Sequence, residues 1–252
     1  MLARIAAHDP ATPFYLFWAP HIAHAPLEVP QSYVDKFSFI KDKPRQLYAA
    51  MVNYVDDMVG RVVAALKAKG MWDDLLWLSS ADNGGPIYNS GVAGANNFPL
   101  RGGKMSNWQG GIRVNAYAAG GLLPAAVRGT KSEGLIAGAD VYATFCALAG
   151  VDPTDARAAA AGLPPIDGLN QWPFLSGAAP TSPRVEVPVG SDATEANLLQ
   201  FSNMTVVQAL VRADGYKLMI GETGQNIWTS LTYPNVRLTR AALRPRCAQQ
   251  RP

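Results

Sequence analysis

The sequence predicts an α/β fold, with a mixed, mainly parallel sheet sandwiched by helices and a small, incomplete C-terminal antiparallel subdomain. Two observations predict the sheet. Short apolar segments at residues 14–18 and 75–80 each run into a loop rich in polar or loop-forming residues, as buried parallel strands do. A long segment with helical spacing lies between them, and a third apolar segment at residues 115–119 continues the alternation.

Two helices are predicted to cover the sheet. The first runs from Pro44 to Lys69, where apolar residues recur at helical spacing and Gly70 is placed to end the helix. The second lies near residues 139–148 and ends at Gly150. Because both alternate with predicted strands, we expect them to pack on the faces of the sheet.

A change in composition predicts a domain boundary. Residues 152–183 are rich in Ala, Gly and Pro, which is typical of a surface connection. After it, two short alternating segments at 206–212 and 216–220 are joined by Asp214-Gly215, a strong hairpin signal. We therefore expect residues 1–185 to form the larger α/β domain and residues 186–252 the antiparallel subdomain.

Composition and charge restrict the class of protein. The 252 residues are 48% apolar and 16% charged, which favours a globular chain over a disordered one. A formal net charge of +3 without a basic block predicts no nucleic-acid partner. Prolines and histidines interrupt the longest uncharged stretches, so no membrane span is expected. Cys146 and Cys247 allow at most one disulfide and have no metal-ligand spacing.

Three loops that follow predicted strands carry residues suited to chemistry. Asp82-Asn83 offers a carboxylate and an amide oxygen, which suit a hard divalent cation, although Asp-Asn-Gly-Gly is also a common turn sequence. Lys104, framed by glycines, can contact an anion as a point charge, although most loop lysines are simply solvated. His24 can act as a general acid, a general base or a ligand.

Asp56 and Asp57 are adjacent carboxylates that fall inside the long predicted helix. They point in different directions and are not expected to form a catalytic pair.

The order of these motifs resembles the sulfatase family, arylsulfatases within the alkaline-phosphatase-like superfamily, and most closely the arylsulfatase B type. The resemblance covers most of residues 13–220 and rests on several segments in the order of the family. They are His24-Ala25-Pro26, Tyr48-Ala49-Ala50-Met51-Val52, Ala81-Asp82-Asn83-Gly84-Gly85, Asn97-Phe98-Pro99-Leu100-Arg101-Gly102-Gly103-Lys104, Trp108-Gln109-Gly110-Gly111-Ile112-Arg113 and Ile166-Asp167-Gly168.

The resemblance implies a function and a set of site residues. Asp82 and Asn83 match two ligands of the active-site divalent cation, usually calcium, Lys104 matches a lysine that contacts the substrate sulfate, and His24 matches a catalytic and substrate-binding histidine on the leaving-group side. The implied substrate is a sulfated small molecule or a sulfated glycan. The family also implies the secretory pathway, a lysosome or the extracellular space, in which case Asn203 of Asn203-Met204-Thr205 is a candidate glycosylation site.

Two family features have no match in these residues. The nucleophile of the family is a formylglycine made from the cysteine of a Cys-x-Pro-x-Arg motif, and neither Cys146 nor Cys247 lies in that motif. The family's early Asp-Asp pair, which completes the metal site, has no match either. The sequence is thus expected to be the later part of a sulfatase, and whether this chain alone is an enzyme stays open. The alternatives are an inactive remnant or binding protein with the same fold, and a phosphoryl-transfer relative in the superfamily.

Overall fold

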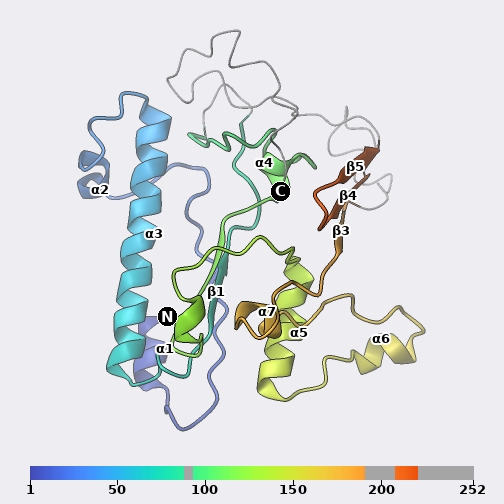
Figure 1. The fold of residues 1–252 in the computed structure, drawn as a ribbon. Coiled ribbons are helices and arrows are strands. Elements are labelled where there is room, and N and C mark those ends of the chain that lie inside the picture. Colours follow the sequence, from blue (N-terminus) through green and yellow to red (C-terminus); the bar gives the residue numbers. More distant parts are fainter. Residues whose placement is uncertain (88–92, 191–207, 221–252) are drawn as a thin grey trace. The chain divides into compact units, whose positions relative to one another are not determined.

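The computed structural model describes residues 1–87, 93–190 and 208–220 of the chain (Figure 1). Its contacts divide the chain into two compact units, and the division falls between Leu122 and Leu123. The predicted domain boundary after residue 185 stays a prediction. The candidate glycosylation site Asn203, as well as Cys247, lies outside the described residues.

The first unit is built around one long helix. Its elements are α1 (Leu2–Ala7), α2 (Gln31–Asp35), α3 (Lys43–Ala68), β1 (Trp77–Ser80), α4 (Gln109–Ile112) and β2 (Ala116–Ala119). The carboxylate of Asp42 caps α3 by accepting a hydrogen bond from the backbone N–H of Arg45 at 3.1 Å, and a proline in the first turn supplies a compatible backbone. The helix predicted from Pro44 to Lys69 is confirmed.

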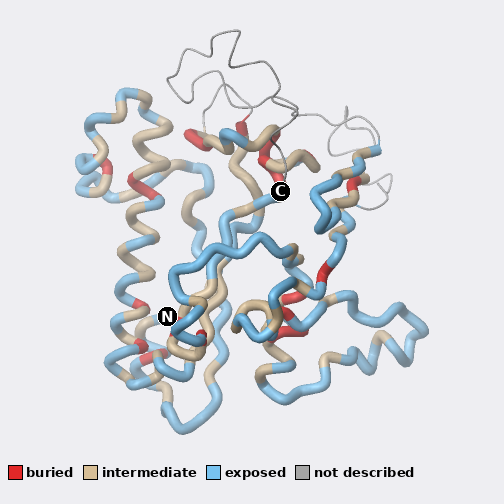
Figure 2. The backbone as a smooth tube through the Cα atoms, viewed as in Figure 1, coloured by how far each residue is buried: buried red, intermediate tan, exposed pale blue. Residues whose placement is uncertain are grey.

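The core of this unit forms where α3 packs against α1 and the segment before β1. Ile5 of α1 contacts Val62 and Leu66 of α3, and all three are buried. Figure 2 colours the backbone by burial, with the buried positions in red. Partly buried aromatic side chains, including those of Phe14, Trp18, Trp72 and Trp77, pack against this cluster. Burial of these apolar side chains, rather than helix propensity alone, stabilises a helix of this length.

The strands of the first unit pair differently from the prediction. β1 and β2 are antiparallel, with Trp77 opposite Ala119 and Ser80 opposite Ala116, and among the described residues β1 has no other strand beside it. The predicted mainly parallel sheet is therefore not found in the part of the chain that the structure describes. A parallel pair would need a further strand at the free edge of β1.

The prediction of a buried strand at residues 14–18 is wrong for this structure. The segment forms neither a helix nor a strand, and the side chains of Tyr15 and Phe17 are 72% and 79% exposed. Phe14 and Trp18 are half-buried against the core. The aromatic residues give this segment the composition of a strand, but a strand also needs a hydrogen-bonded neighbour, which local sequence does not supply.

The second unit holds the remaining elements, which are η2 (Ala125–Val127), α5 (Gly138–Ala149), α6 (Ala156–Ala160), α7 (Trp172–Leu175), β3 (Glu186–Val189), β4 (Gln208–Arg212) and β5 (Lys217–Ile220). The helix predicted near residues 139–148 is confirmed, and Gly150 ends it in the left-handed conformation with φ of 66°. The predicted hairpin is also confirmed, because β4 and β5 pair antiparallel on either side of Asp214-Gly215. β3 completes a three-stranded antiparallel sheet.

No helix among the described residues is both long enough and apolar enough to span a bilayer.

Candidate active site

The loop that leaves β1 presents two oxygen atoms suited to a cation. The backbone N–H of Asn83 donates to Oδ1 of Asp82 at 2.8 Å, and Nδ2 of Asn83 donates to the carbonyl oxygen of Gly84 at 2.7 Å. These bonds fix both side chains close to their own backbone. Within the described residues, Oδ2 of Asp82 and Oδ1 of Asn83 have no hydrogen-bond partner, and carboxylate and amide oxygens are the ligands that calcium prefers.

Asn97 joins this loop to the loop that carries Lys104. Its side chain accepts a hydrogen bond from the N–H of Gly85 at 3.0 Å and donates to the carbonyl oxygens of Gly85 at 2.7 Å and Gly102 at 3.1 Å. The N–H of Lys104 donates to the same Gly85 carbonyl at 3.2 Å. The backbone at Lys104 is therefore held directly beside the loop of Asp82.

A third loop, at the start of α4, closes this arrangement. The N–H of Gly84 donates to the carbonyl of Gly111 at 2.8 Å, and the N–H of Gly110 donates to the carbonyl of Arg101 at 2.7 Å. A methyl group at Gly84 would overlap the carbonyl oxygen of Gly110. Glycine is needed at position 84 because two backbones approach too closely for a side chain. We call residues 82–85, 97–104 and 108–111 the loop cluster.

The loop cluster contains one buried polar atom without a partner. The guanidinium of Arg101 lies 4.0 Å from the ring centroid of Trp108. Nε1 of Trp108 is buried and, in the part of the chain described, has no hydrogen-bond acceptor. An unpaired buried N–H costs about 1–3 kcal/mol, so an added acceptor at this point would stabilise the cluster.

His24 lies against Lys104. Nζ of Lys104 is 3.1 Å from Nε2 of His24, across 80 positions of sequence. The other ring nitrogen of His24, Nδ1, lies 2.8 Å from the carbonyl oxygen of Ala25. An ammonium group has only donors, so Nε2 is the acceptor, and Nδ1 carries the ring proton and donates it to the carbonyl.

The structure thus brings His24 into contact with Lys104, and joins both to Asp82 and Asn83 through backbone hydrogen bonds at Gly85. Among the described residues, no three side chains of His, Cys, Asp or Glu gather in a group that could hold a metal ion. Asn97, which occurs in one of the quoted motifs, had been given no role from the sequence. The signal was its position between two glycine-rich loops, whose backbone groups need hydrogen-bond partners from outside a helix or a sheet.

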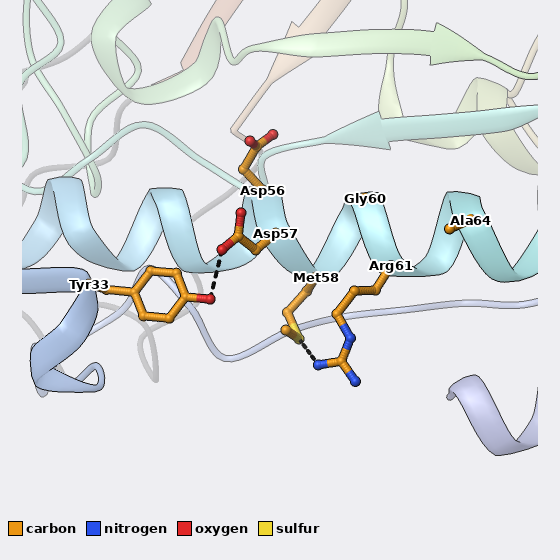
Figure 3. A pocket seen from close by; sticks show the side chains of 7 residues that line it. All are labelled: Tyr33, Asp56, Asp57, Met58, Gly60, Arg61 and Ala64. Carbon is orange, nitrogen blue, oxygen red and sulfur yellow. Dashed lines mark hydrogen bonds between the residues drawn. The ribbon is translucent and has the colours of Figure 1, made fainter. Parts of the chain in front are cut away.

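Asp56 and Asp57 lie in a surface pocket of the first unit (Figure 3). Asp57 accepts a hydrogen bond from the hydroxyl group of Tyr33 at 2.7 Å and lies 3.7 Å from the ammonium of Lys36. This hydrogen bond raises the pKa of Tyr33. The Asp56 side chain points away from Tyr33, because successive helical residues are about 100° apart. The expectation that the two carboxylates point in different directions is confirmed.

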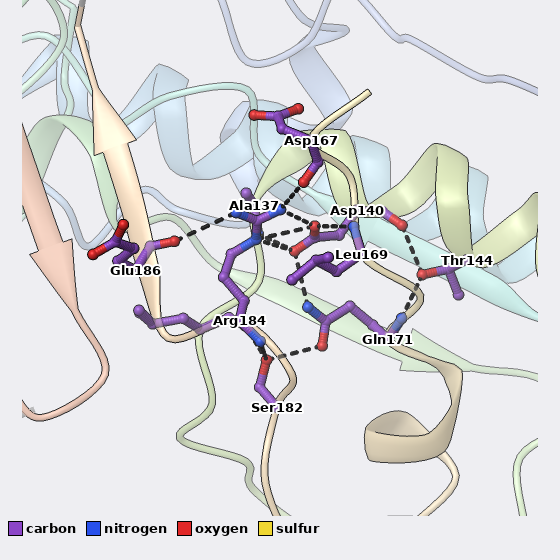
Figure 4. Close-up of polar contacts among 10 residues, drawn as sticks. Ala137, Asp140, Thr144, Asp167, Leu169, Gln171, Ser182, Arg184 and Glu186 are labelled. Atoms are coloured by element: carbon purple, nitrogen blue, oxygen red, sulfur yellow. Dashed lines mark hydrogen bonds and ion pairs between the residues drawn. The ribbon is translucent and has the colours of Figure 1, made fainter. Parts of the chain in front are cut away.

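A buried polar network holds the second unit together (Figure 4). Nε of Arg184 donates to Oδ2 of Asp140 at 2.8 Å, and Nε2 of Gln171 donates to the same oxygen at 2.9 Å. The N–H of Leu169 donates to Oδ1 at 2.8 Å, and the N–H of Ala137 donates to Oδ2 at 2.8 Å. Burial raises the pKa of Asp140, but these hydrogen bonds outweigh it and hold that pKa below its ordinary value. Neither Asp140 nor Arg184 is predicted from the sequence to have a role.

Comparisons with known proteins identify the family of this chain. The family model described as Sulfatase matches residues 1–151. Mouse (Mus musculus) arylsulfatase J is 31% identical over 232 residues, which are 89% of this chain and 36% of that protein. Human (Homo sapiens) N-acetylgalactosamine-6-sulfatase is 32% identical over 175 residues, 69% of this chain and 30% of that protein.

A solved structure extends the comparison to the fold. The crystal structure of Ps i-CgsB in complex with k-i-k-neocarrahexaose is 29% identical, with a TM-score of 0.64 over 80% of this chain and 40% of that chain. The fold is therefore of the α/β class seen in sulfatases. The chain belongs to the sulfatase family. It spans about a third of the length of the curated relatives described above.

Proposed function

We propose that this chain supplies the later part of a sulfuric ester hydrolase active site, in which Lys104 and His24 bind the sulfate ester and assist its cleavage. The observation that carries the proposal is the contact of 3.1 Å between Nζ of Lys104 and Nε2 of His24. Two groups that come from distant parts of the sequence share one position beside the Asp82 loop. A sulfate group at that position would contact both the ammonium group of Lys104 and the imidazole of His24, which can carry a proton.

The chemistry of the pair follows from its charges. An anionic sulfate competes with the imidazole for the ammonium of Lys104, because a charge-assisted bond to an anion is stronger than one to a neutral ring. Nε2 of His24 is then free to take up a proton from solvent, and the resulting imidazolium can donate that proton to the oxygen that leaves with the alcohol or phenol. Protonating that oxygen as its bond to sulfur breaks lowers the barrier.

Asp82 and Asn83 are the proposed cation ligands in this chain, and calcium is the proposed ion. A bound divalent cation would polarise the sulfate and offset the charge on its oxygens. The two available oxygens fit a hard cation in type but are fewer than the 6–8 that calcium takes. We therefore expect weak calcium binding by the chain alone. Calorimetric titration showing sub-micromolar affinity that disappears in Asp82→Ala, but not in Asp74→Ala, would contradict this.

The proposed substrate is a sulfated glycan or a sulfated small molecule. The names of the relatives support it, since one is an N-acetylgalactosamine-6-sulfatase and a structural neighbour was crystallised with a neocarrahexaose.

We also propose that residues 1–185 belong to the catalytic α/β domain, whose mainly parallel sheet is completed by residues outside this sequence, and that residues 186–252 form the C-terminal subdomain. A secretory, lysosomal or extracellular location and glycosylation at Asn203 remain part of the proposal.

Hydrolysis of an activated aryl sulfate tests the function. The 252-residue chain alone is expected to show no turnover above background, because it has no Cys-x-Pro-x-Arg cysteine to become the nucleophile. A form extended upstream by a sulfatase segment with that motif, expressed with the formylglycine-generating enzyme, is expected to turn over. In that form Lys104→Ala should lower kcat/KM by about 100-fold or more.

The exposed lysine variant Lys131→Ala is the matched control, and it should keep full activity. Fast turnover by the short chain that is abolished by Lys104→Ala would refute the account of the nucleophile. Full activity of the extended Lys104→Ala variant would refute the role of Lys104.

A further inference from the structure

Met105, the residue directly after Lys104, has an unusual backbone conformation. Its φ of 69° is left-handed, and within the described part of the chain no other residue except glycine has a positive φ. The conformation costs free energy in any residue with a Cβ atom, because that atom comes too close to the following carbonyl oxygen. It persists only where the surrounding structure enforces it, and such residues cluster at functional sites.

A tight turn from Gly103 to Ser106 enforces this conformation. The N–H of Ser106 donates to the carbonyl oxygen of Gly103 at 3.1 Å, and its Oγ donates to the same oxygen at 2.8 Å. The N–H of Gly103 donates to Oγ of Ser106 at 3.3 Å, and Ser106 is buried. Met105 is the third residue of the turn, where a type II turn requires a positive φ and usually has Gly or Asn.

Two other backbone segments hold the same turn. A methyl group on Gly111 would overlap the carbonyl oxygens of Ser106 and Gly103, so the start of α4 packs directly on the turn. The N–H of Lys104 donates to the carbonyl oxygen of Gly85 at 3.2 Å. Lys104 is the second residue of this turn, and its backbone is therefore fixed by contacts with both segments.

Packing of the Met105 side chain does not explain why a residue with a Cβ atom occupies this position. The side chain is 40% exposed. Glycine would adopt the same φ without strain, but glycine also populates many other conformations. A residue with a Cβ atom has only a small allowed range of φ and ψ in the left-handed region. Met105 thus narrows the range of directions in which the preceding residue, Lys104, can point.

We propose that Met105 is a positioning residue for Lys104. Its left-handed backbone directs the lysine so that Nζ lies 3.1 Å from Nε2 of His24. The side chain of lysine is long and flexible, so a change in the direction of the backbone moves the ammonium group away from the imidazole. The inference rests on the proposed function, because positioning matters for turnover only if Lys104 and His24 act on the sulfate ester.

The first experiment measures the contact between Lys104 and His24 in the 252-residue chain. Through-space NMR cross-peaks between the Lys104 side chain and the ring protons of His24 report this contact without turnover. Met105→Ile introduces a β-branched side chain, which is a genuine outlier at positive φ, so the cross-peaks should be lost. Met105→Gly relieves the strain and widens the conformational range, so it should weaken the cross-peaks without lowering the denaturant midpoint of the chain.

Met105→Asn is the matched control for the side chain. Asparagine tolerates the left-handed conformation better than other residues with a Cβ atom. The variant should therefore keep the cross-peaks between Lys104 and His24 although the methionine side chain is gone. Loss of the cross-peaks in this variant would mean that the side chain, and not the backbone conformation, positions the lysine.

The second experiment uses the extended, formylglycine-containing form. Met105→Ile should lower kcat/KM by about 10–100-fold, because a small misplacement of a positioned group has an effect of this size. In the Lys104→Ala background the same substitution should cause no further loss, since it acts through the lysine. A purely structural role of Met105 would lower activity in both backgrounds.

Several outcomes would overturn the inference. They are intact cross-peaks in Met105→Ile, their loss in Met105→Asn, and an equal loss of activity in both backgrounds. If Met105→Ile does not fold, intact cross-peaks in Met105→Gly are the contradicting result. Cross-peaks that depend on residue 105, in a chain whose extended form hydrolyses no sulfate ester, refute the proposed function and leave this inference standing. Hydrolysis that depends on Lys104 but not on residue 105 does the reverse.

Discussion

Nζ of Lys104 lies 3.1 Å from Nε2 of His24, and this contact fixes which nitrogen of the imidazole carries a proton. Lysine can only donate, so Nε2 accepts and Nδ1 donates to the carbonyl of Ala25 at 2.8 Å. The neutral ring is therefore held in one tautomer by two neighbours. The ring presents its unprotonated nitrogen, Nε2, toward the place where we propose that the sulfate binds.

We expect nitrogen NMR to find the ring of His24 protonated at Nδ1 and unprotonated at Nε2 when the ring is neutral. Lys104→Met removes the donor, so the Nε2-protonated tautomer should gain population. Lys41→Met, at a lysine outside the loop cluster, should leave the His24 signals unchanged. A spectrum dominated by Nε2–H in the unmodified chain would contradict the assignment.

Asn97→Ala should loosen the loop cluster. The substitution removes one acceptor and two donors that tie Gly85 to Gly102, and unpaired buried backbone groups cost about 1–3 kcal/mol each. Hydrogen exchange at the amides of Gly85 and Lys104 should become faster in the variant. Asn170→Ala, which removes one exposed bond to the N–H of Trp172, is the control and should leave those amides unchanged.

Two glycine substitutions should have opposite effects on the free energy of unfolding. Gly84→Ala places a methyl group on the carbonyl oxygen of Gly110, so it should destabilise the first unit. Gly60→Ala meets open space in the interior of α3 and should stabilise by about 0.5–1 kcal/mol, because alanine loses less backbone entropy. Chemical denaturation measures both. Equal effects of the two variants would show that close backbone approach at Gly84 is not the constraint.

Asp140→Ala should destabilise the second unit by about 3–5 kcal/mol at pH 7, because the buried guanidinium of Arg184 loses its partner. The exposed pair of Arg212 and Asp214 supplies the control, and Asp214→Ala should change stability by about 1 kcal/mol or less. Denaturant titrations of both variants give these values. A small effect of Asp140→Ala would mean that water replaces the carboxylate at no cost.

The carboxylate of Asp140 should also make the free energy of unfolding depend on pH. The pKa of Asp140 is lowered in the folded chain, so the unfolded chain binds its proton more readily. Its contribution is therefore complete above the unfolded pKa, about 3.9, and is lost as pH falls below it through the folded pKa. The unmodified chain should lose stability over this range more steeply than Asp140→Ala does. Parallel pH profiles for the two proteins would contradict the expectation.

Local sequence by itself determined the elements whose stability depends on near neighbours. The helical spacing between Pro44 and Lys69 predicted α3, Gly150 marked the end of α5, and Asp214-Gly215 predicted the hairpin of β4 and β5. Helix caps, apolar periodicity and tight turns involve residues within a few positions of one another, so the pattern contains the needed information. The sequence also singled out the motif residues His24, Asp82, Asn83 and Lys104, whose roles stay predictions.

Tertiary structure decided the relationships between distant residues. Lys104 meets His24 across 80 positions, and Arg184 meets Asp140 across 44. β1 pairs antiparallel with β2, and Tyr15 and Phe17, within the segment predicted as a buried strand, are left exposed. A segment's sequence sets which of its side chains are apolar, but burial and pairing depend on which other segments are present to cover it and to satisfy its backbone hydrogen bonds.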